Sequence, residues 1–364
     1  MTSGEASAKV WLSTQRTEAP NMNLRIVLAL ISSLAVLFIL YAICCALIAH
    51  RFTHARRIRV ALPPAGIAAA PVRFEARDGL ASIDAWHVQA PQPRGAVILV
   101  PGRGACRGYE LRSATFPLVQ EFVAAGLSVM MIDLRGHGTS SASRMTYGEH
   151  ERHDVLGAFD WLNANGYSGL RIGVLGASMG AAAALFAAAD EPAIAALVVD
   201  SPFAELQSLV EQSFRAKTGL PRCCIPGVAV AGRMLTGLDL RRVRPIDRAP
   251  ELGGRPMLVV HNEDDRLIPV GHGRAIAEAC GAELWTRPSG GHVGAYRCGP
   301  EIYAARMVGF FVRHLTGNSQ RAAANDARMV TGPVARAAAA RASVGIGAYV
   351  SFGDCSGALK VRPA

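Results

Sequence analysis

The sequence predicts an α/β domain with a mainly parallel, twisted sheet and helices on both faces, preceded by one membrane-crossing helix. Short, wholly apolar runs alternate with helix-like segments over most of the chain, which is typical of strands buried on both faces. One longer apolar run lies near the start and carries no charge. The chain has 364 residues, of which 51% are hydrophobic, enough for one large domain with a substantial core.

The longest apolar run covers residues 26–49 and contains no Gly, Pro or charged residue. Its 24 residues span roughly 36 Å as a helix, and the hydrocarbon core of a bilayer is about 30 Å thick. The run is also longer than the roughly 7 to 15 apolar residues of a secretory signal, and no small-residue cleavage site follows it. We therefore expect residues 1–60 to form an N-terminal segment that crosses a membrane once.

Basic residues flank the predicted span on both sides. Three precede it, at Lys9, Arg16 and Arg25, and four follow it, at Arg51, Arg56, Arg57 and Arg59. Because positive charge is enriched on the cytoplasmic side of membrane spans, this margin of one charge favours a cytoplasmic domain. The net charge of +10 comes almost entirely from arginine and forms no dense basic segment, so we expect a membrane as partner and no nucleic acid.

Residues 61–316 carry the alternating pattern of the domain. A linker at 61–71 leads into residues 72–90, where alternation around a DG turn predicts a hairpin of two antiparallel strands. The apolar runs that predict buried strands lie at 95–100, 127–134, 171–176, 195–200, 256–261 and 282–286. The segments that predict helices lie near 112–125 and 147–164, after 178, and near 300–315.

Two segments depart from this alternation. Residues 203–250 carry some helical pattern and the sequence PRCCIPG, and we expect them to form a small lid inserted between two strands. Residues 317–364 are rich in Ala, Gly and Arg without a lasting period, so we expect a loosely ordered tail. No CxxC pair occurs in the chain, which argues against a zinc site.

The sequence GASMG, residues 176–180, joins a predicted strand to a predicted helix and places Ser178 between two glycines. A sharp strand-to-helix turn exposes a serine hydroxyl, and its neighbours must be small because the turn crowds and strains its own backbone. Residues 181–184 are all alanine and allow the helix to pack closely against the sheet. The alternative is a glycine-rich structural turn, but this context favours a nucleophile.

A serine nucleophile needs a base, and the base needs an acid that orients it. In the order serine, acid, histidine, Asp265 follows the strand at 256–261 and His292 follows the strand at 282–286. Both lie after the carboxyl ends of predicted parallel strands, where α/β sheets assemble their sites. The sequence therefore predicts a triad of Ser178, Asp265 and His292.

Several neighbouring residues are alternatives for these roles. Glu263 and Asp264 compete with Asp265 for the acid, although an acidic cluster of this kind is also typical of a solvated loop. His272 competes for the base, but it opens a predicted helix and we expect it at the surface. His261 ends a strand and is expected to be a packed or hydrogen-bonded structural histidine.

The tetrahedral intermediate of acyl transfer needs two hydrogen-bond donors for its oxyanion. The first is expected to be the backbone N–H of Met179, which follows the serine. The second is expected in the loop PGRGACRGY after the strand at 95–100, where Gly102 and Gly104 give the backbone freedom to turn an N–H inward. We assign it to the backbone of Arg103 alone, with simple solvation as the alternative for the arginine side chain.

Four motifs outside the serine turn resemble the α/β-hydrolase superfamily. MMIDLRGHGTS resembles its D-x-R-G-x-G-x-S loop, with the serine shifted by one to Ser140. TYGEHERHDVLGAFDWL resembles the G-x-x-E-x-x-D helix of the Bem46-like and serine aminopeptidase-like branch, which includes lysophospholipase-like proteins. HNEDDRLIP and GGH resemble the acid and histidine motifs of that branch, which implies Asp265 as acid and His292 as base. Two departures are Pro101, where a histidine is usual, and Asn262, where a glycine is usual.

These features together predict a membrane-anchored serine hydrolase that cleaves an ester or thioester through an acyl-enzyme. The chemistry needs no metal and no cofactor, and the anchor favours a small-molecule or lipid acyl substrate. Alternatives are a serine peptidase of the same fold and a non-catalytic acyl-binding or scaffolding protein. Since none of the predicted chemistry lies in residues 1–55, their removal is expected to leave the reactive serine intact.

Overall fold

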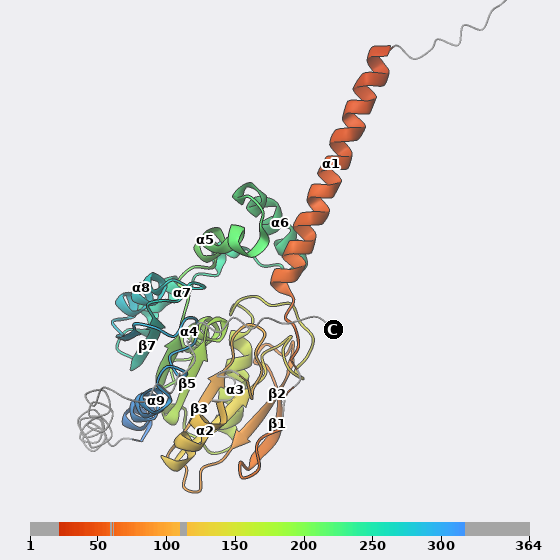
Figure 1. Cartoon of the computed structure of the whole chain (residues 1–364). Helices are drawn as coiled ribbons and strands as arrows, with labels where there is room; N and C mark the ends of the chain where they lie inside the picture. Colours follow the sequence, from red (N-terminus) through yellow and green to blue (C-terminus); the bar gives the residue numbers. More distant parts are fainter. Residues whose placement is uncertain (1–21, 59, 61, 110–114, 317–364) are drawn as a thin grey trace, which may run out of the picture.

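The computed structural model describes residues 22–58, 60, 62–109 and 115–316, so the expected tail at 317–364 lies outside the described residues. Its centre is one eight-stranded sheet in the order β1-β2-β4-β3-β5-β6-β7-β8 (Figure 1). The first hairpin is antiparallel and pairs antiparallel with β4, whereas all other neighbours are parallel. The strands are β1 (Ala69–Glu75), β2 (Ser82–Val88), β3 (Gly95–Val100), β4 (Leu127–Ile132), β5 (Ile172–Ala177), β6 (Ala196–Asp200), β7 (Met257–Asn262) and β8 (Glu283–Arg287).

Helices cover both faces of this sheet, as the sequence predicts. One apolar core joins the sheet to α3, α4 and α8, and a second joins its other face to α2 and α9. Strands β3, β4, β5, β6 and β7 are buried along their whole length, which explains why their sequences are continuous apolar runs. These helices are α2 (Thr115–Ala124), α3 (Arg152–Ala164), α4 (Met179–Asp190), α8 (Val270–Cys280) and α9 (Pro300–Leu315).

Helix α3 starts five residues later than the sequence pattern predicts. Tyr147 and Gly148 have positive φ angles of 57° and 106°, so the chain makes a turn there instead of a helix. The buried carboxylate of Glu151 accepts hydrogen bonds from the backbone N–H groups of Thr146 and Gly148, both at 2.8 Å. A buried acidic side chain therefore holds the turn that the periodicity did not reveal.

The lid lies between β6 and β7 and consists mainly of α5 (Leu206–Thr218) and α6 (Ile225–Thr236), followed by the short α7 (Pro245–Arg248). Figure 1 shows α5 and α6 beyond the end of the sheet, beside the lower end of a long helix that projects away from the domain. That helix is α1 (Met22–Thr53). The most apolar 18 residues of Asn23–Thr53 have a mean hydropathy of 2.8 and none of them is buried, so the helix is long and apolar enough to cross a membrane.

The end of α1 packs against the lid. Cys45 and Ala49 form a small apolar cluster with Phe214 of α5 and Val228 of α6. The two helices approach closely because α6 has a glycine at the contact, where a Cβ on Gly227 would overlap Cys45.

The chain that follows α1 also belongs to the domain. Ala55 lies in the main core, the carbonyl of Thr53 accepts a hydrogen bond from Met145 N–H at 2.8 Å, and Arg57 donates to the carbonyl of Ser140 at 2.8 Å. Removal of residues 1–55 therefore takes away part of the packing of the domain. That the shortened protein keeps a reactive Ser178 stays a prediction.

Candidate active site

Ser178 occupies a strained turn between β5 and α4. Its φ and ψ angles are 53° and −115°, a backbone conformation that non-glycine residues rarely adopt. Its N–H donates to the carbonyl of Asp200 at 2.8 Å, which ties the turn to the end of the neighbouring strand β6. Such strain persists only where surrounding contacts enforce it, and here it points the hydroxyl into a cavity.

The two glycines of this turn are required by close backbone contacts. A Cβ on Gly180 would overlap the carbonyl oxygens of Val100 and Pro101, so α4 passes directly against the end of β3. A Cβ on Gly176 would overlap the backbone of Gly180 itself. The glycines around Ser178 therefore permit a turn that any side chain would obstruct.

His292 and Asp265 complete a continuous hydrogen-bonded chain to Ser178. The Oγ of Ser178 lies 2.8 Å from Nε2 of His292, and Nδ1 of the same ring lies 2.8 Å from Oδ2 of Asp265. Because an ionised carboxylate can only accept, Nδ1 carries the proton and Nε2 is free to accept the serine hydroxyl. The three residues selected from the sequence thus meet in the arrangement that a serine nucleophile needs.

The structure holds Asp265 as a carboxylate. Burial would raise the pKa of Asp265, but hydrogen bonds from His261, His292 and the backbone N–H of Ile268 outweigh it and hold the pKa well below its ordinary value. The other oxygen, Oδ1, accepts from the N–H groups of Leu267 at 2.8 Å and Ile268 at 2.9 Å. Both oxygens are therefore fixed, which orients the carboxylate towards the imidazole.

The alternative acids occupy other positions. Glu263 is exposed, and its carboxylate lies 3.8 Å from Arg274, whereas the imidazole of His292 is bonded to Asp265. Asp264 accepts hydrogen bonds from the N–H groups of Gly291 at 2.7 Å and Gly290 at 3.2 Å. Asp264 therefore supports the loop that carries His292, a role that sequence reasoning missed because it depends on contacts across 26 and 27 positions.

The two other histidines near the acid loop have structural surroundings. His261 is buried, and its Nε2 lies 2.8 Å from the carbonyl of Ile268 and 3.6 Å from Asp265. His272 was expected at the surface, but this expectation is wrong. It is buried, and its Nδ1 accepts a hydrogen bond from Ala204 N–H at 3.3 Å, because the lid entry packs over α8.

A second buried acid, Asp200, lies beneath the triad at the end of β6. Tyr303 donates to its Oδ2 at 3.0 Å and Ser201 to its Oδ1 at 2.9 Å. Burial raises the pKa of Asp200 above its ordinary value, although these hydrogen bonds act against the increase. The Ser201 oxygen also accepts from Val293 N–H at 3.2 Å, so this network supports the residue after His292.

The two backbone donors expected for an oxyanion lie at the same cavity. Met179 begins α4, and its N–H donates to no other described residue. Gly102, Arg103 and Gly104 line the cavity opposite, and Gly104 has a φ of 73°. The side chain of Arg103 is not simply solvated, since it donates to the carbonyl of Arg51 at 2.9 Å.

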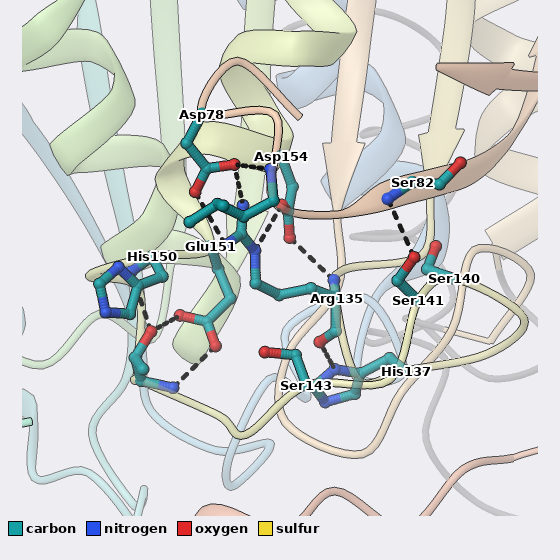
Figure 2. Close-up of polar contacts among 12 residues, drawn as sticks. Asp78, Ser82, Arg135, His137, Ser140, Ser141, Ser143, His150, Glu151 and Asp154 are labelled. Atoms are coloured by element: carbon teal, nitrogen blue, oxygen red, sulfur yellow. Dashed lines mark hydrogen bonds and ion pairs between the residues drawn. The ribbon is translucent and has the colours of Figure 1, made fainter. Parts of the chain in front are cut away.

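Figure 2 shows the polar network of the loop after β4. Arg135 is buried and binds Asp154 through Nε at 2.8 Å and Asp78 through Nη1 at 2.9 Å. Burial raises the pKa of Asp154 to about 7, against the opposing effect of Arg135. Glu151 holds the adjoining turn, which places Tyr147 in the cavity wall. This network fixes part of the wall, and no hydrogen bond or ion pair among the described residues joins it to the triad.

The cavity in front of Ser178 has a volume of about 690 Å³. Phe203 of the β6 loop, Leu206 and Leu209 of α5, and Leu267 and Ile268 of the acid loop supply apolar wall. A space of this size, with a reactive serine at one side, accommodates an acyl chain or a comparable apolar group.

Comparison with known proteins gives the same fold. The family model for serine aminopeptidase S33 matches residues 91–248. The uncharacterised protein YqkD of Bacillus subtilis is 29% identical over 193 residues, and the match covers 52% of this chain and 61% of that protein. The chain therefore spans less than two thirds of the length of this relative.

Solved structures extend the likeness over most of the described domain. The esterase Pf2001 of Pyrococcus furiosus superposes with a TM-score of 0.59 at 21% identity, covering 72% of this chain and 100% of that chain. The α/β hydrolase GrgF of a Penicillium species gives 0.53 at 19% identity, covering 70% and 99%. The acylaminoacyl peptidase of Pyrococcus horikoshii gives 0.53 at 16% identity, covering 71% and 44%. With the mostly parallel sheet, these likenesses show that the domain has the α/β-hydrolase fold.

Proposed function

We propose that this protein is a membrane-anchored serine hydrolase that cleaves an acyl ester or thioester. The observation that carries the proposal is the chain of two 2.8 Å contacts from Ser178 through His292 to Asp265. It supplies the nucleophile, the base and the orienting acid of acyl transfer in one hydrogen-bonded line.

In the proposed reaction, Ser178 Oγ attacks the acyl carbon while His292 Nε2 takes its proton. The Met179 and Arg103 N–H groups stabilise the oxyanion, and His292 then gives the proton to the leaving alcohol or thiol. Water attacks the acyl-serine by the same steps in reverse and releases the carboxylic acid. Asp265 remains ionised throughout, because its carboxylate is the form that the surrounding donors stabilise.

The charge of the cavity distinguishes this reaction from aminopeptidase activity. A substrate with a free amino terminus carries an ammonium group, which a carboxylate would have to bind. The described residues that line the cavity include several cations and no Asp or Glu. An ester or thioester acyl group therefore suits the cavity better than a peptide amino terminus.

Membrane anchoring by α1 is part of the proposal. The exposed apolar side chains of α1 have no partner among the described residues over most of its length, and a lipid bilayer would cover them. Arg51, Arg56 and Arg57 follow the span, which by the positive-inside rule favours a cytoplasmic catalytic domain. Protease added outside intact cells should leave the domain uncut. Digestion of the domain would show that it lies on the opposite, non-cytoplasmic side of the membrane.

A fluorophosphonate probe tests the nucleophile. The full-length protein should be labelled at Ser178, and Ser178→Ala should abolish labelling. Ser213 provides a matched control, since it also lines the cavity but donates to the carbonyl of Leu209 and forms no hydrogen bond with a histidine among the described residues. Ser213→Ala should label normally, whereas an unlabelled wild-type protein would identify a non-catalytic acyl-binding or scaffolding role.

A further inference from the structure

The anchor helix and the lid together form the outer wall of the active-site cavity. Arg51 and Phe52 at the end of α1, and His54 and Arg56 just after it, line the cavity from one side. Lys217, in the last turn of α5, lines it from the lid. Residues next to the predicted membrane surface are therefore part of the substrate site.

This wall is strongly basic. Five basic residues are among the described residues that line the cavity, and no acidic residue is among them: Arg51, Arg56, Arg103, Lys217 and Arg297. Arg103 and Arg297 are occupied, since they donate to the carbonyls of Arg51 and Gly290 at 2.9 and 3.3 Å.

The remaining three cations, Arg51, Arg56 and Lys217, have no carboxylate partner among the described residues. Other arginines that the structure describes do bind a carboxylate, including Arg73, Arg77, Arg107, Arg135, Arg152, Arg244 and Arg248.

Gathering like charges at one wall has an electrostatic cost. Partial desolvation and the nearby charge of Arg103 lower the pKa of Lys217 below its ordinary value. A bound anion would stabilise the charged ammonium and offset this repulsion. The wall is thus better suited to an anionic ligand than to water alone.

The same cavity is apolar nearer the lid base, where Phe203, Leu206 and Leu209 lie. A ligand that satisfies both parts must be an amphiphile, with an apolar chain and an anionic group. Arginine and lysine clusters preferentially bind phosphate groups, which accept several charge-assisted hydrogen bonds.

We infer that the substrate is an acyl ester whose alcohol carries a phosphate group, bound at the cavity rim by Arg51, Arg56 and Lys217. This inference rests on the proposed function of Ser178. The acyl chain lies among the apolar side chains, the ester carbonyl meets Ser178, and the phosphate meets the rim. Attack by Ser178 breaks the acyl–oxygen bond, and the phosphorylated alcohol leaves with the proton supplied by His292.

The position of the rim favours a lipid amphiphile over a dissolved phosphate ester. The rim lies at the domain end of α1, where a membrane span would emerge among lipid headgroups. Beside it, α6 exposes Val230 and Met234, which are 61% and 83% exposed. An amphiphile held in the same bilayer would present its phosphate at the level of these cations.

The test compares two soluble esters that differ only in the phosphate, 1-butyrylglycerol 3-phosphate and 1-butyrylglycerol, with full-length protein in neutral detergent. The wild type should favour the phosphate ester by about tenfold in kcat/KM. Lys217→Gln and Arg51→Gln should each reduce that preference by about threefold, because each removes one rim charge. Arg215→Gln should not, since Arg215 is an exposed cation of the same helix outside the cavity lining.

A wild-type preference near one, or an equal effect of Arg215→Gln, overturns the inference while leaving the serine hydrolase intact. Hydrolysis of both esters that survives Ser178→Ala instead overturns the proposed function.

If the protein hydrolyses neither short ester, the inference is tested by measuring how well ligands protect Ser178 from labelling by the fluorophosphonate. Dodecyl phosphate should protect at concentrations about tenfold lower than dodecanol, and equal protection by the two overturns the inference. Equal protection by inorganic phosphate also overturns it, since the anion and the chain would then not belong to one ligand.

Discussion

Ser178 lies at the carboxyl ends of the parallel strands, and this edge of the sheet is stabilised differently from the lid and anchor that cover it. At the sheet edge, side chains and backbone form one hydrogen-bonded network, and Ser178, Ser201 and Val293 are held at positive φ angles. The lid and the end of α1 meet mainly through apolar side chains such as Cys45 and Phe214, and they place unpaired cations at the cavity.

The difference separates reactivity from selectivity. A hydrogen-bonded network of fixed geometry suits chemistry that must place atoms accurately, whatever the substrate. An apolar and basic wall on a separate insertion can change its ligand without disturbing that network. We expect substitutions at the sheet edge to affect turnover of every ester, and substitutions in the lid and anchor to affect the choice among esters.

The largest effect is expected at the acid. Asp265→Asn should reduce kcat by about 10³- to 10⁴-fold, because the imidazole loses the acceptor that fixes its tautomer. Asp264→Asn is the matched control and should remain within about tenfold of wild type, since an amide oxygen can still accept from Gly291 N–H. Steady-state hydrolysis of 4-nitrophenyl butyrate measures both. A greater loss of kcat in Asp264→Asn than in Asp265→Asn would mean that Asp264, and not Asp265, orients the imidazole.

Two truncations compare the anchor with the wall that it contributes. Removal of residues 1–55 deletes Arg51, Phe52 and the packing of Ala55, so we expect at least a tenfold loss in kcat/KM and a lower melting temperature. Removal of residues 1–40 keeps these contacts, and should retain kcat/KM within about threefold in detergent. Equal activity of the two truncated proteins would mean that the end of α1 has no part in the cavity.

Two glycine substitutions contrast the rigid edge with the lid. Gly180→Ala should destabilise the fold by about 2–4 kcal/mol, because its Cβ would overlap the Val100 and Pro101 carbonyls. Gly232→Ala, in the middle of α6, meets no atom within 4 Å and should be neutral or stabilising by up to about 1 kcal/mol. Chemical denaturation measures both, and a similar loss at the two sites would contradict the contrast.

The smallest effect is a pH dependence of stability. Because the folded protein lowers the pKa of Asp265, the stability that its carboxylate contributes is complete above the unfolded value of about 3.9 and is lost as the pH falls through the folded value. The difference in melting temperature between wild type and Asp265→Asn should therefore shrink as the pH is lowered from 6 to 3. A difference that grows on acidification would mean that the carboxyl is protonated in the folded protein.

Much of this molecule could be predicted from sequence because the relevant signals are local. Continuous apolar runs indicate β3 and β5, and the glycines around Ser178 indicate a strained turn whose crowding is seen at Gly180. Asp265 and His292 each follow a predicted strand, and because these strands are parallel, both residues lie at the same end of the sheet.

The features that escaped prediction depend on contacts between distant residues. Tyr303 meets Asp200 across 103 positions, and Arg103 meets Arg51 across 52, with no periodic pattern to announce either contact. The role of the anchor in the cavity was hidden for the same reason. The apolar run of α1 predicts a membrane span, but the residues after it carry no signal of the wall that they form.

The central claim is that Ser178 becomes acylated during turnover. Wild-type protein mixed with excess 4-nitrophenyl butyrate, quenched in acid within the first turnovers and digested, should yield the peptide of Ser178 with the added mass of one butyryl group. Asp265→Asn should accumulate much less of the modified peptide in the same time, and Ser178→Ala none. Steady hydrolysis without an adduct at Ser178, or an adduct on a different residue, would contradict the account.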